Sequence, residues 1–259
     1  MNGMNKKFPL LLLVCAFSFL ITGCMDITGR GPAPLAKTVG PATREYPRVG
    51  HVYCMRGWLG IFSTGMDVLA DEIDTQGGTP AVSVADEEWR RLKGWLIEEH
   101  NAGQIHEPLV LLGHSWGADD MIRVCDELKQ EHISVDLLVL IDPVTPSPVP
   151  ANVKRVYCIF KSHPVTDGVP FWRGVSAAVA DPHVTSITNI DLRTANVGFD
   201  TSVIDHINIE KSAGVHQMVM DQIKLVCPTR LVWEQTHGQA QSISQRAPTA
   251  PVEKTTGMP

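Results

Sequence analysis

Short hydrophobic runs recur between positions 49 and 192, and segments with a helical hydrophobic period separate most of them. Runs of about four to eight apolar residues are typical of strands buried on both faces of a sheet. Strands alternating with helices predict βαβ units. We therefore expect an α/β domain with a compact, mostly parallel sheet of about six strands, at residues 49–55, 79–84, 108–113, 135–141, 153–160 and 184–192.

Apolar residues three or four positions apart predict four helices between these strands. Ser63 or Thr64 is a suitable cap for the first helix, and the second begins near Asp86 with acidic residues in its first turn. A last helix begins near Ser212 and ends before Pro228. The third helix has its buried face at Ala118, Met121, Ile122, Cys125 and Leu128.

Two connections do not fit this alternation. Residues 142–152 contain four prolines and no helical period, yet they must join two strands of one sheet. A parallel crossover of about 12 residues without a helix is at the short limit, so the pattern leaves this crossover unexplained. Residues 163–183, with Phe171 and Trp172, are numerous enough for a short helix that walls a pocket.

The N-terminus has the pattern of a secretory signal. Lys6 and Lys7 precede an apolar run over 8–21, which is shorter than a bilayer span. The sequence Ile21-Thr22-Gly23-Cys24 follows and resembles the lipobox of bacterial lipoproteins, which implies cleavage before Cys24 and acylation of that residue. An ordinary signal peptide with an incidental Cys24 is the alternative.

These segments give a domain organisation. We expect a signal peptide at 1–23, a flexible tether rich in Gly and Pro at 24–48, a catalytic domain at 49–230 and a disordered tail at 231–259. The lipobox implies a cell-envelope protein anchored to a membrane at Cys24. In Gram-negative lipoproteins a Met rather than an Asp after the Cys resembles outer-membrane sorting, on the periplasmic side.

Charge and cysteine content narrow the classes of partner. The formal net charge is -6, and loss of Lys6 and Lys7 with the signal makes the chain more acidic, which argues against nucleic acid as a partner. No Cys-x-x-Cys or His-Glu-x-x-His spacing occurs, so we expect no metal and no cofactor. The cysteines of the mature domain lie in or beside apolar runs, which favours free thiols over any of three disulfide pairings: Cys54, Cys125, Cys158 and Cys227.

The strongest chemical signal is Gly113-His114-Ser115-Trp116-Gly117, between a predicted strand and a predicted helix. In this context the chain must reverse sharply, so small residues flank a serine whose hydroxyl is presented at a helix N-terminus. This arrangement resembles the nucleophile elbow of the α/β-hydrolase superfamily of lipases, esterases and thioesterases, and the resemblance extends over about residues 49–227. It implies Ser115 as nucleophile, followed along the chain by an acid and then a histidine.

Asp142 and Asp167 are the candidates for the acid. Asp142 ends the fourth predicted strand, on the sheet edge where Ser115 lies, and Asp142-Pro143 is similar to the acid position of pancreatic-type lipases and of some thioesterase domains. Asp167 follows the next strand, the commoner family position, but lies several residues beyond it in a loop. We favour Asp142.

For the base we favour His206, which lies between the last strand and the last helix, where the family has its histidine. His216, inside the last helix, and His183, in the insertion, are the alternatives. His114 occupies a spacer position within the elbow.

The oxyanion hole would take its first donor from the Trp116 N–H and its second from the Trp58 N–H, in a loop resembling the family's His-Gly loop with Arg56 in place of the His. Arg56 is suited either to an anionic part of the substrate or to a surface ion pair.

The resemblance implies a serine hydrolase that cleaves a carboxylic ester or thioester through a Ser115-His206-Asp142 triad and an acyl-enzyme. Aromatic residues favour a lipid-like acyl substrate if they line the pocket: Trp58, Phe62, Trp116, Phe171 and Trp172. The alternative is an inactive lipoprotein that retained the fold as a binding or envelope scaffold module.

Overall fold

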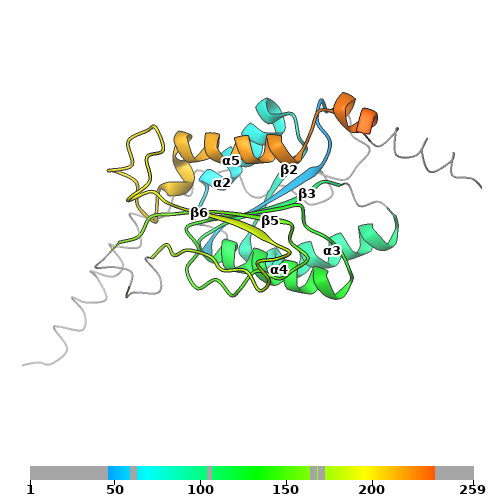
Figure 1. The fold of residues 1–259 in the computed structure, drawn as a ribbon, viewed down its shortest axis with the longest axis horizontal. Coiled ribbons are helices and arrows are strands. Elements are labelled where there is room, and N and C mark those ends of the chain that lie inside the picture. The colour runs from blue at the N-terminus through cyan, green and yellow to red at the C-terminus, as the bar shows by residue number, and fades with distance from the viewer. Residues whose placement is uncertain (1–45, 59–62, 104–106, 164–167, 169–172, 237–259) are drawn as a thin grey trace, which may run out of the picture.

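The predicted parallel sheet is confirmed by a computed structural model that describes residues 46–58, 63–103, 107–163, 168 and 173–236. Six strands, all paired in parallel, lie in the order β2-β1-β3-β4-β5-β6 (Figure 1). Because the strands are parallel, all their carboxyl ends lie at one edge of the sheet. The strands are β1 (His51–Met55), β2 (Ala81–Val84), β3 (Leu109–His114), β4 (Leu137–Ile141), β5 (Arg155–Phe160) and β6 (Ser186–Asp191).

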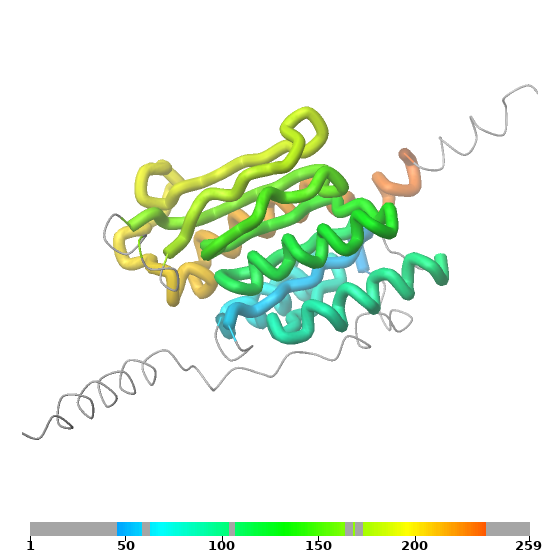
Figure 2. Tube along the Cα trace, turned by 90° about the horizontal axis from the view of Figure 1, so that it is seen from below, coloured from blue at the N-terminus to red at the C-terminus, as the bar shows by residue number. Residues whose placement is uncertain are grey.

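Helices cover both faces of the sheet. Helices α2 (Gly65–Glu72) and α5 (Ala213–Val226) lie on one face, and α3 (Trp89–Asn101) and α4 (Trp116–Gln130) lie on the other (Figure 1). Figure 2 shows α3 and α4 side by side across their face. The central strands β3 and β4 are buried along their whole length, which explains their uninterrupted apolar sequences.

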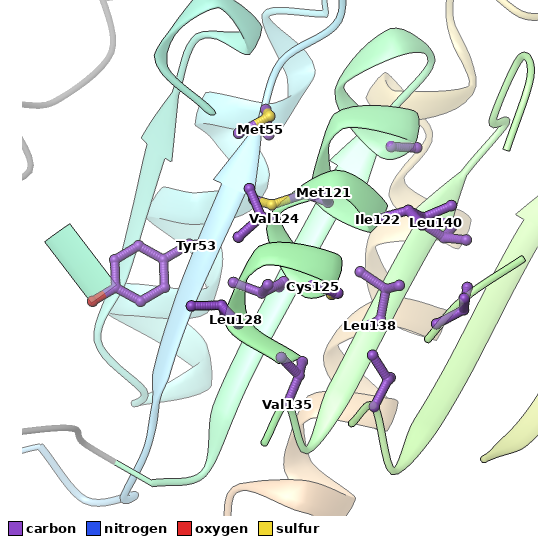
Figure 3. Close-up of a cluster of buried hydrophobic side chains, with 14 of the residues drawn as sticks. Tyr53, Met55, Met121, Ile122, Val124, Cys125, Leu128, Val135, Leu138 and Leu140 are labelled. Carbon is purple, nitrogen blue, oxygen red and sulfur yellow. The ribbon is translucent and has the colours of Figure 1, made fainter. Parts of the chain in front are cut away.

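The sheet separates two hydrophobic clusters. On the α4 side, residues of the helix pack on alternate residues of the strands: Figure 3 shows Met121, Cys125 and Leu128 over this face, with Leu138 and Leu140 from β4. On the other side, α2 and α5 pack on the residues between, such as Val110 and Val139. The alternation of side chains along each strand thus builds two cores from one sheet.

The helix boundaries agree with the hydrophobic pattern. Ser212 caps α5, and α5 ends at Val226, two residues before Pro228. The first helix begins at Gly65 with Thr64 as its N-cap residue, and the π-helical turn η3 (Ile73–Gly77) continues it. A 3-10 turn, η4 (Asp86–Glu88), precedes α3.

The short crossover has a structural explanation. The segment between β4 and β5 runs across the α4 face and buries Val144, Val149 and Val153 in the space where a helix would otherwise lie. Val149 pairs with Val179 in a parallel bridge, and Asp119 of α4 accepts hydrogen bonds from the backbone N–H groups of Val144 (3.3 Å) and Thr145 (2.8 Å). Because Val179 belongs to the later segment, two loops together replace the missing helix.

The expected helix in residues 163–183 is not found in its described part, since residues 173–183 contain none. Phe171 and Trp172 lie outside the described residues. The segment instead pairs with its neighbours: Asn189 of β6 exchanges two hydrogen bonds with the backbone of Ala177, at 2.9 and 3.0 Å. These bonds satisfy backbone groups that a helix would have paired internally.

The ends of the described chain meet. Arg48 and Thr229 form an antiparallel bridge, the Arg230 N–H donates to the Pro47 carbonyl at 2.9 Å, and residues 230–236 are helical. Structure therefore extends beyond 49–230 at both ends. The signal segment, Cys24 and residues 237–259 lie outside the described residues. None of the described helices is both long and apolar enough to cross a bilayer.

Candidate active site

Ser115 lies in a sharp turn between β3 and α4. Its backbone has φ +57° and ψ -126°, in the left-handed half of conformational space, which non-glycine residues rarely adopt. The glycines on either side are required by close backbone packing. A Cβ on Gly113 would lie 2.4 Å from the Gly117 carbonyl oxygen, and a Cβ on Gly117 would lie 2.1 Å from the Arg56 carbonyl oxygen. The motif therefore forms the strained elbow that its sequence predicts.

Ser115, His206 and Asp142 form one chain of hydrogen bonds. The Ser115 Oγ lies 2.9 Å from the His206 Nε2, and the His206 Nδ1 lies 2.6 Å from the Asp142 Oδ2. A carboxylate only accepts, so the imidazole carries its hydrogen on Nδ1 and leaves Nε2 as the acceptor of the serine hydroxyl. The structure thus brings together the three residues that the sequence analysis favoured.

The Asp142 carboxylate is held from several sides. Asp142 follows β4, its backbone has φ +49°, and its side chain is 1% exposed. Its second oxygen, Oδ1, accepts the backbone N–H of Lys161 at 2.9 Å. Gly174 packs directly on the carboxylate, because a Cβ there would lie 1.6 Å from Oδ1. The Asp142 carboxylate is therefore held in place beside His206.

His206 lies in a loop without regular structure, which is ordered by its own side chains. The Asp205 Oδ1 accepts the N–H groups of Ile207 and Asn208 at 2.9 and 3.2 Å, and the Asn208 amide donates to the Val203 carbonyl at 3.0 Å. Ile204 is buried in the core on the α5 side of the sheet. These contacts form a local turn with His206 at its centre.

The side chain of His114 contacts the loop that carries His206. Its Nε2 lies 3.1 Å from the His206 carbonyl oxygen and its Nδ1 lies 2.6 Å from the Ser63 Oγ. Burial, and then the nearby His206, hold the pKa of His114 well below its ordinary value. The ring is therefore neutral, donates from Nε2 and accepts the Ser63 hydroxyl at Nδ1. His114 therefore does not pair with Ser115 Oγ in the described structure, and its ring supports the backbone of His206.

The other histidine candidates do not reach Ser115. His216 is buried in α5, where its Nδ1 pairs with Glu72 and its Nε2 donates to the Glu210 carbonyl, both at 2.7 Å. His183 is exposed in a turn before β6. Asp167 lies outside the described residues. Within the described ranges, no group of three or more His, Cys, Asp or Glu side chains is arranged to hold a metal ion, and all four cysteines are free thiols.

The loop after β1 lies against Ser115. A Cβ on Gly57 would lie 3.1 Å from the Ser115 Cβ, so the backbone that leads to Trp58 passes directly beside Ser115. Trp58 itself is 51% exposed. The expectation for Arg56 needs correction: the side chain is buried, and its guanidinium forms two hydrogen bonds with the Asp67 carboxylate of α2, one of them 2.7 Å from Nε to Oδ1. It holds this loop to α2 and forms no surface ion pair.

Three residues of the site escaped the sequence analysis: Ser63, Lys161 and Gly174. Each is recognised only by its contacts with a residue distant in the chain. Ser63 has the left-handed φ of +66° and lies just before α2, where it was considered only as a helix cap. Lys161 and Gly174 lie in a connection whose sequence has no periodic pattern.

The sequence matches no protein-family model and no curated protein sequence. Solved structures similar to the chain include an esterase from the archaeon Pyrobaculum calidifontis, at 18% identity and a TM-score of 0.30, where the alignment covers 40% of each chain. An esterase domain from Rhodothermus marinus is 11% identical, with a TM-score of 0.40 over 71% of this chain and 89% of the other. A thioesterase from the prodiginine biosynthetic pathway in Streptomyces coelicolor is 10% identical, with a TM-score of 0.41 over 72% and 92%.

Proposed function

We propose that the protein is a serine hydrolase that cleaves a carboxylic ester or thioester. The observation that carries the proposal is the unbroken hydrogen-bond chain from the Ser115 Oγ through the His206 ring to the buried Asp142 carboxylate. Its three members come from separate loops, and the parallel sheet brings the loops after β3 and β4 to one edge. A serine paired with an imidazole that a carboxylate orients is the arrangement that activates a hydroxyl for acyl transfer.

Each of the three residues has a step in the proposed reaction. The His206 Nε2 takes the hydroxyl proton as the Ser115 Oγ attacks the carbonyl carbon, and Asp142 stabilises the imidazolium that forms. The tetrahedral intermediate then collapses to an acyl-serine as His206 protonates the leaving group. A water molecule, deprotonated by His206, then attacks the acyl carbon. His206 returns this proton to the Ser115 Oγ as the acyl-serine bond breaks and the acid leaves.

Backbone N–H groups beside Ser115 are the proposed stabilisers of the oxyanion. Trp116 is the first residue of α4, so its N–H lies at a helix N-terminus directly after the nucleophile. The Trp58 N–H is the proposed second donor, because Gly57 packs on Ser115. Losing one such donor typically costs about 3 kcal/mol of transition-state stabilisation.

Apolar side chains near the triad favour an acyl substrate with a hydrophobic part. Trp58 is 51% exposed, and Val203 and Ile207, on either side of His206 in the chain, are 75% and 37% exposed. Exposed large apolar side chains that flank reactive residues are typical of sites that bind an apolar group. Such a hydrophobic acyl part is compatible with the substrates of lipases, esterases and thioesterases alike.

Hydrolysis of p-nitrophenyl butyrate and of butyryl-CoA by the full-length chain tests the proposal. We expect turnover by the wild type and none above background by a folded Ser115→Ala variant. Butyryl-CoA as the preferred substrate would indicate a thioesterase. If the folded wild type hydrolyses neither compound and binds an acyl ligand instead, the alternative of an inactive binding module is correct.

We also propose that Cys24 is acylated and attaches the domain to a cell-envelope membrane, facing the periplasm. The support is the sequence alone: a basic start, a short apolar run and the lipobox-like residues before Cys24. Incorporation of labelled palmitate in the wild type, and its loss in Cys24→Ser, is the expected result. Incorporation that persists in Cys24→Ser would contradict the proposal.

A further inference from the structure

The loop that carries His206 connects the edge strand β6 to the short 3-10 helix η5 (Ile209–Lys211) and has no regular secondary structure over residues 192–208. A general base must keep its ring within hydrogen-bonding distance of the nucleophile. The turn centred on Asp205 and Asn208 fixes the local shape of the loop, but it does not fix where the loop lies relative to Asp142. Contacts from outside the loop must do so.

Lys161, the first residue after β5, makes such contacts in two directions. Its backbone N–H donates to the Asp142 Oδ1 at 2.9 Å. Its ammonium group reaches across to the loop and donates to three backbone carbonyls, those of Thr201 (2.7 Å), Ser202 (3.4 Å) and Ile204 (2.6 Å). An ammonium group has three hydrogens, so these carbonyls account for all of its donors. One residue therefore contacts both the acid and the loop that carries the base.

These contacts have different consequences for the two partners. The bond to Asp142 comes from the backbone and is retained when the side chain is changed. The bonds to the loop come from the ammonium group, and hydrogen bonds to a charged donor are roughly twice as strong as neutral ones. Removal of the ammonium group should therefore release the loop while Asp142 stays in place.

We propose that Lys161 is a positioning residue that fixes the His206 loop relative to Asp142, an inference that rests on the proposed hydrolase function. The residue touches no reacting atom, and its effect on the reaction passes through the 2.6 Å contact between the His206 Nδ1 and the Asp142 Oδ2. His114, which donates to the His206 carbonyl, supports the loop at a second point. Loss of the Lys161 ammonium group should therefore lower kcat without abolishing activity.

Lys161→Met is the test, since methionine keeps an unbranched chain and removes the donors. With p-nitrophenyl butyrate and the full-length protein, we expect kcat to fall about 10- to 100-fold and KM to change less than about threefold. A fall in kcat with little change in KM distinguishes a misplaced His206 from a loss of substrate binding.

Lys154→Met is the matched control. Lys154 precedes the same strand at its opposite end, and its exposed side chain pairs with Asp136 at 2.7 Å. We expect its kcat and KM to equal those of the wild type. Lys161→Arg retains a cationic donor and should recover part of kcat.

The possible failures are distinguishable. A folded wild type that hydrolyses no ester would overturn the proposed function. An active wild type with an unchanged Lys161→Met variant, or with a Lys161→Met variant whose KM rises while kcat stays in place, would overturn the role of Lys161 and leave the triad intact. If circular dichroism shows that Lys161→Met does not fold, the same comparison is made with Lys161→Gln, which keeps two amide donors but no charge.

Discussion

Replacement of Gly174 by alanine should lower the activity of the site strongly, although it replaces none of the three triad residues. The added Cβ would lie 1.6 Å from the Asp142 Oδ1 and 2.2 Å from the Cγ of the same carboxyl group. Contacts under 3.0 Å are essentially never made by real Cβ atoms, so one of the two groups must move by more than about 1 Å. Asp142 is enclosed between His206 and the backbone of Lys161, so a displaced carboxylate loses its contact with one of them.

A misplacement of about 1 Å in a catalytic group costs about 100-fold in rate. We therefore expect kcat for p-nitrophenyl butyrate to fall by about that factor in Gly174→Ala, with a smaller change in KM. Gly168→Ala is the control, because a Cβ at Gly168 would have no neighbour within 4 Å. Circular dichroism and thermal melting establish that both variants fold. A folded Gly174→Ala variant with wild-type kcat would refute the placement of Asp142 against Gly174.

Two further predictions concern stability. Arg56→Met leaves the mostly buried Asp67 carboxylate without its guanidinium partner, which should lower the free energy of unfolding by about 3 kcal/mol and the Tm by about 10 °C. The double variant Arg56→Met/Asp67→Leu should recover much of this loss. An unchanged Tm in the single variant would contradict the ion pair. Burial raises the pKa of Glu210 to about 7, so between its ordinary value and pH 7 the folded state keeps a proton that the unfolded state has released. The free energy of unfolding should then fall as the pH rises through this window, by up to about 3 kcal/mol, and Glu210→Gln should remove this dependence in melts at pH 5 and pH 8. An equal pH dependence of the free energy of unfolding in the wild type and in Glu210→Gln would refute this prediction.

The sheet and the elbow that carries Ser115 could be predicted because their signals are local. Strands buried on both faces need uninterrupted apolar runs, as in Leu137–Ile141, and a strand-to-helix elbow needs small residues beside its serine. Asp142 followed from the topology, because the carboxyl ends of neighbouring parallel strands meet at one edge. Chain order alone indicated His206, whose loop has no periodic pattern.

The remaining features depend on contacts between distant segments. The crossover after β4 needs no helix because Val149 pairs with Val179, a partner that hydrophobic periodicity cannot identify. Arg56 was expected to bind an anionic part of the substrate or to form a surface ion pair, but it is buried, and Asp67 on the next helix compensates its charge. Lys161 has an ordinary position after a strand, and only the path of the loop 40 residues later gives its ammonium group three carbonyl partners.

The central claim is that Ser115 is an activated nucleophile. Its most direct test is intact-mass and peptide mass spectrometry of the full-length protein after treatment with a fluorophosphonate probe, which reacts covalently with activated serines. We expect one adduct per chain, located on Ser115, and no adduct in Ser115→Ala. A folded wild-type protein without an adduct, or one whose adduct persists in Ser115→Ala, would contradict the claim.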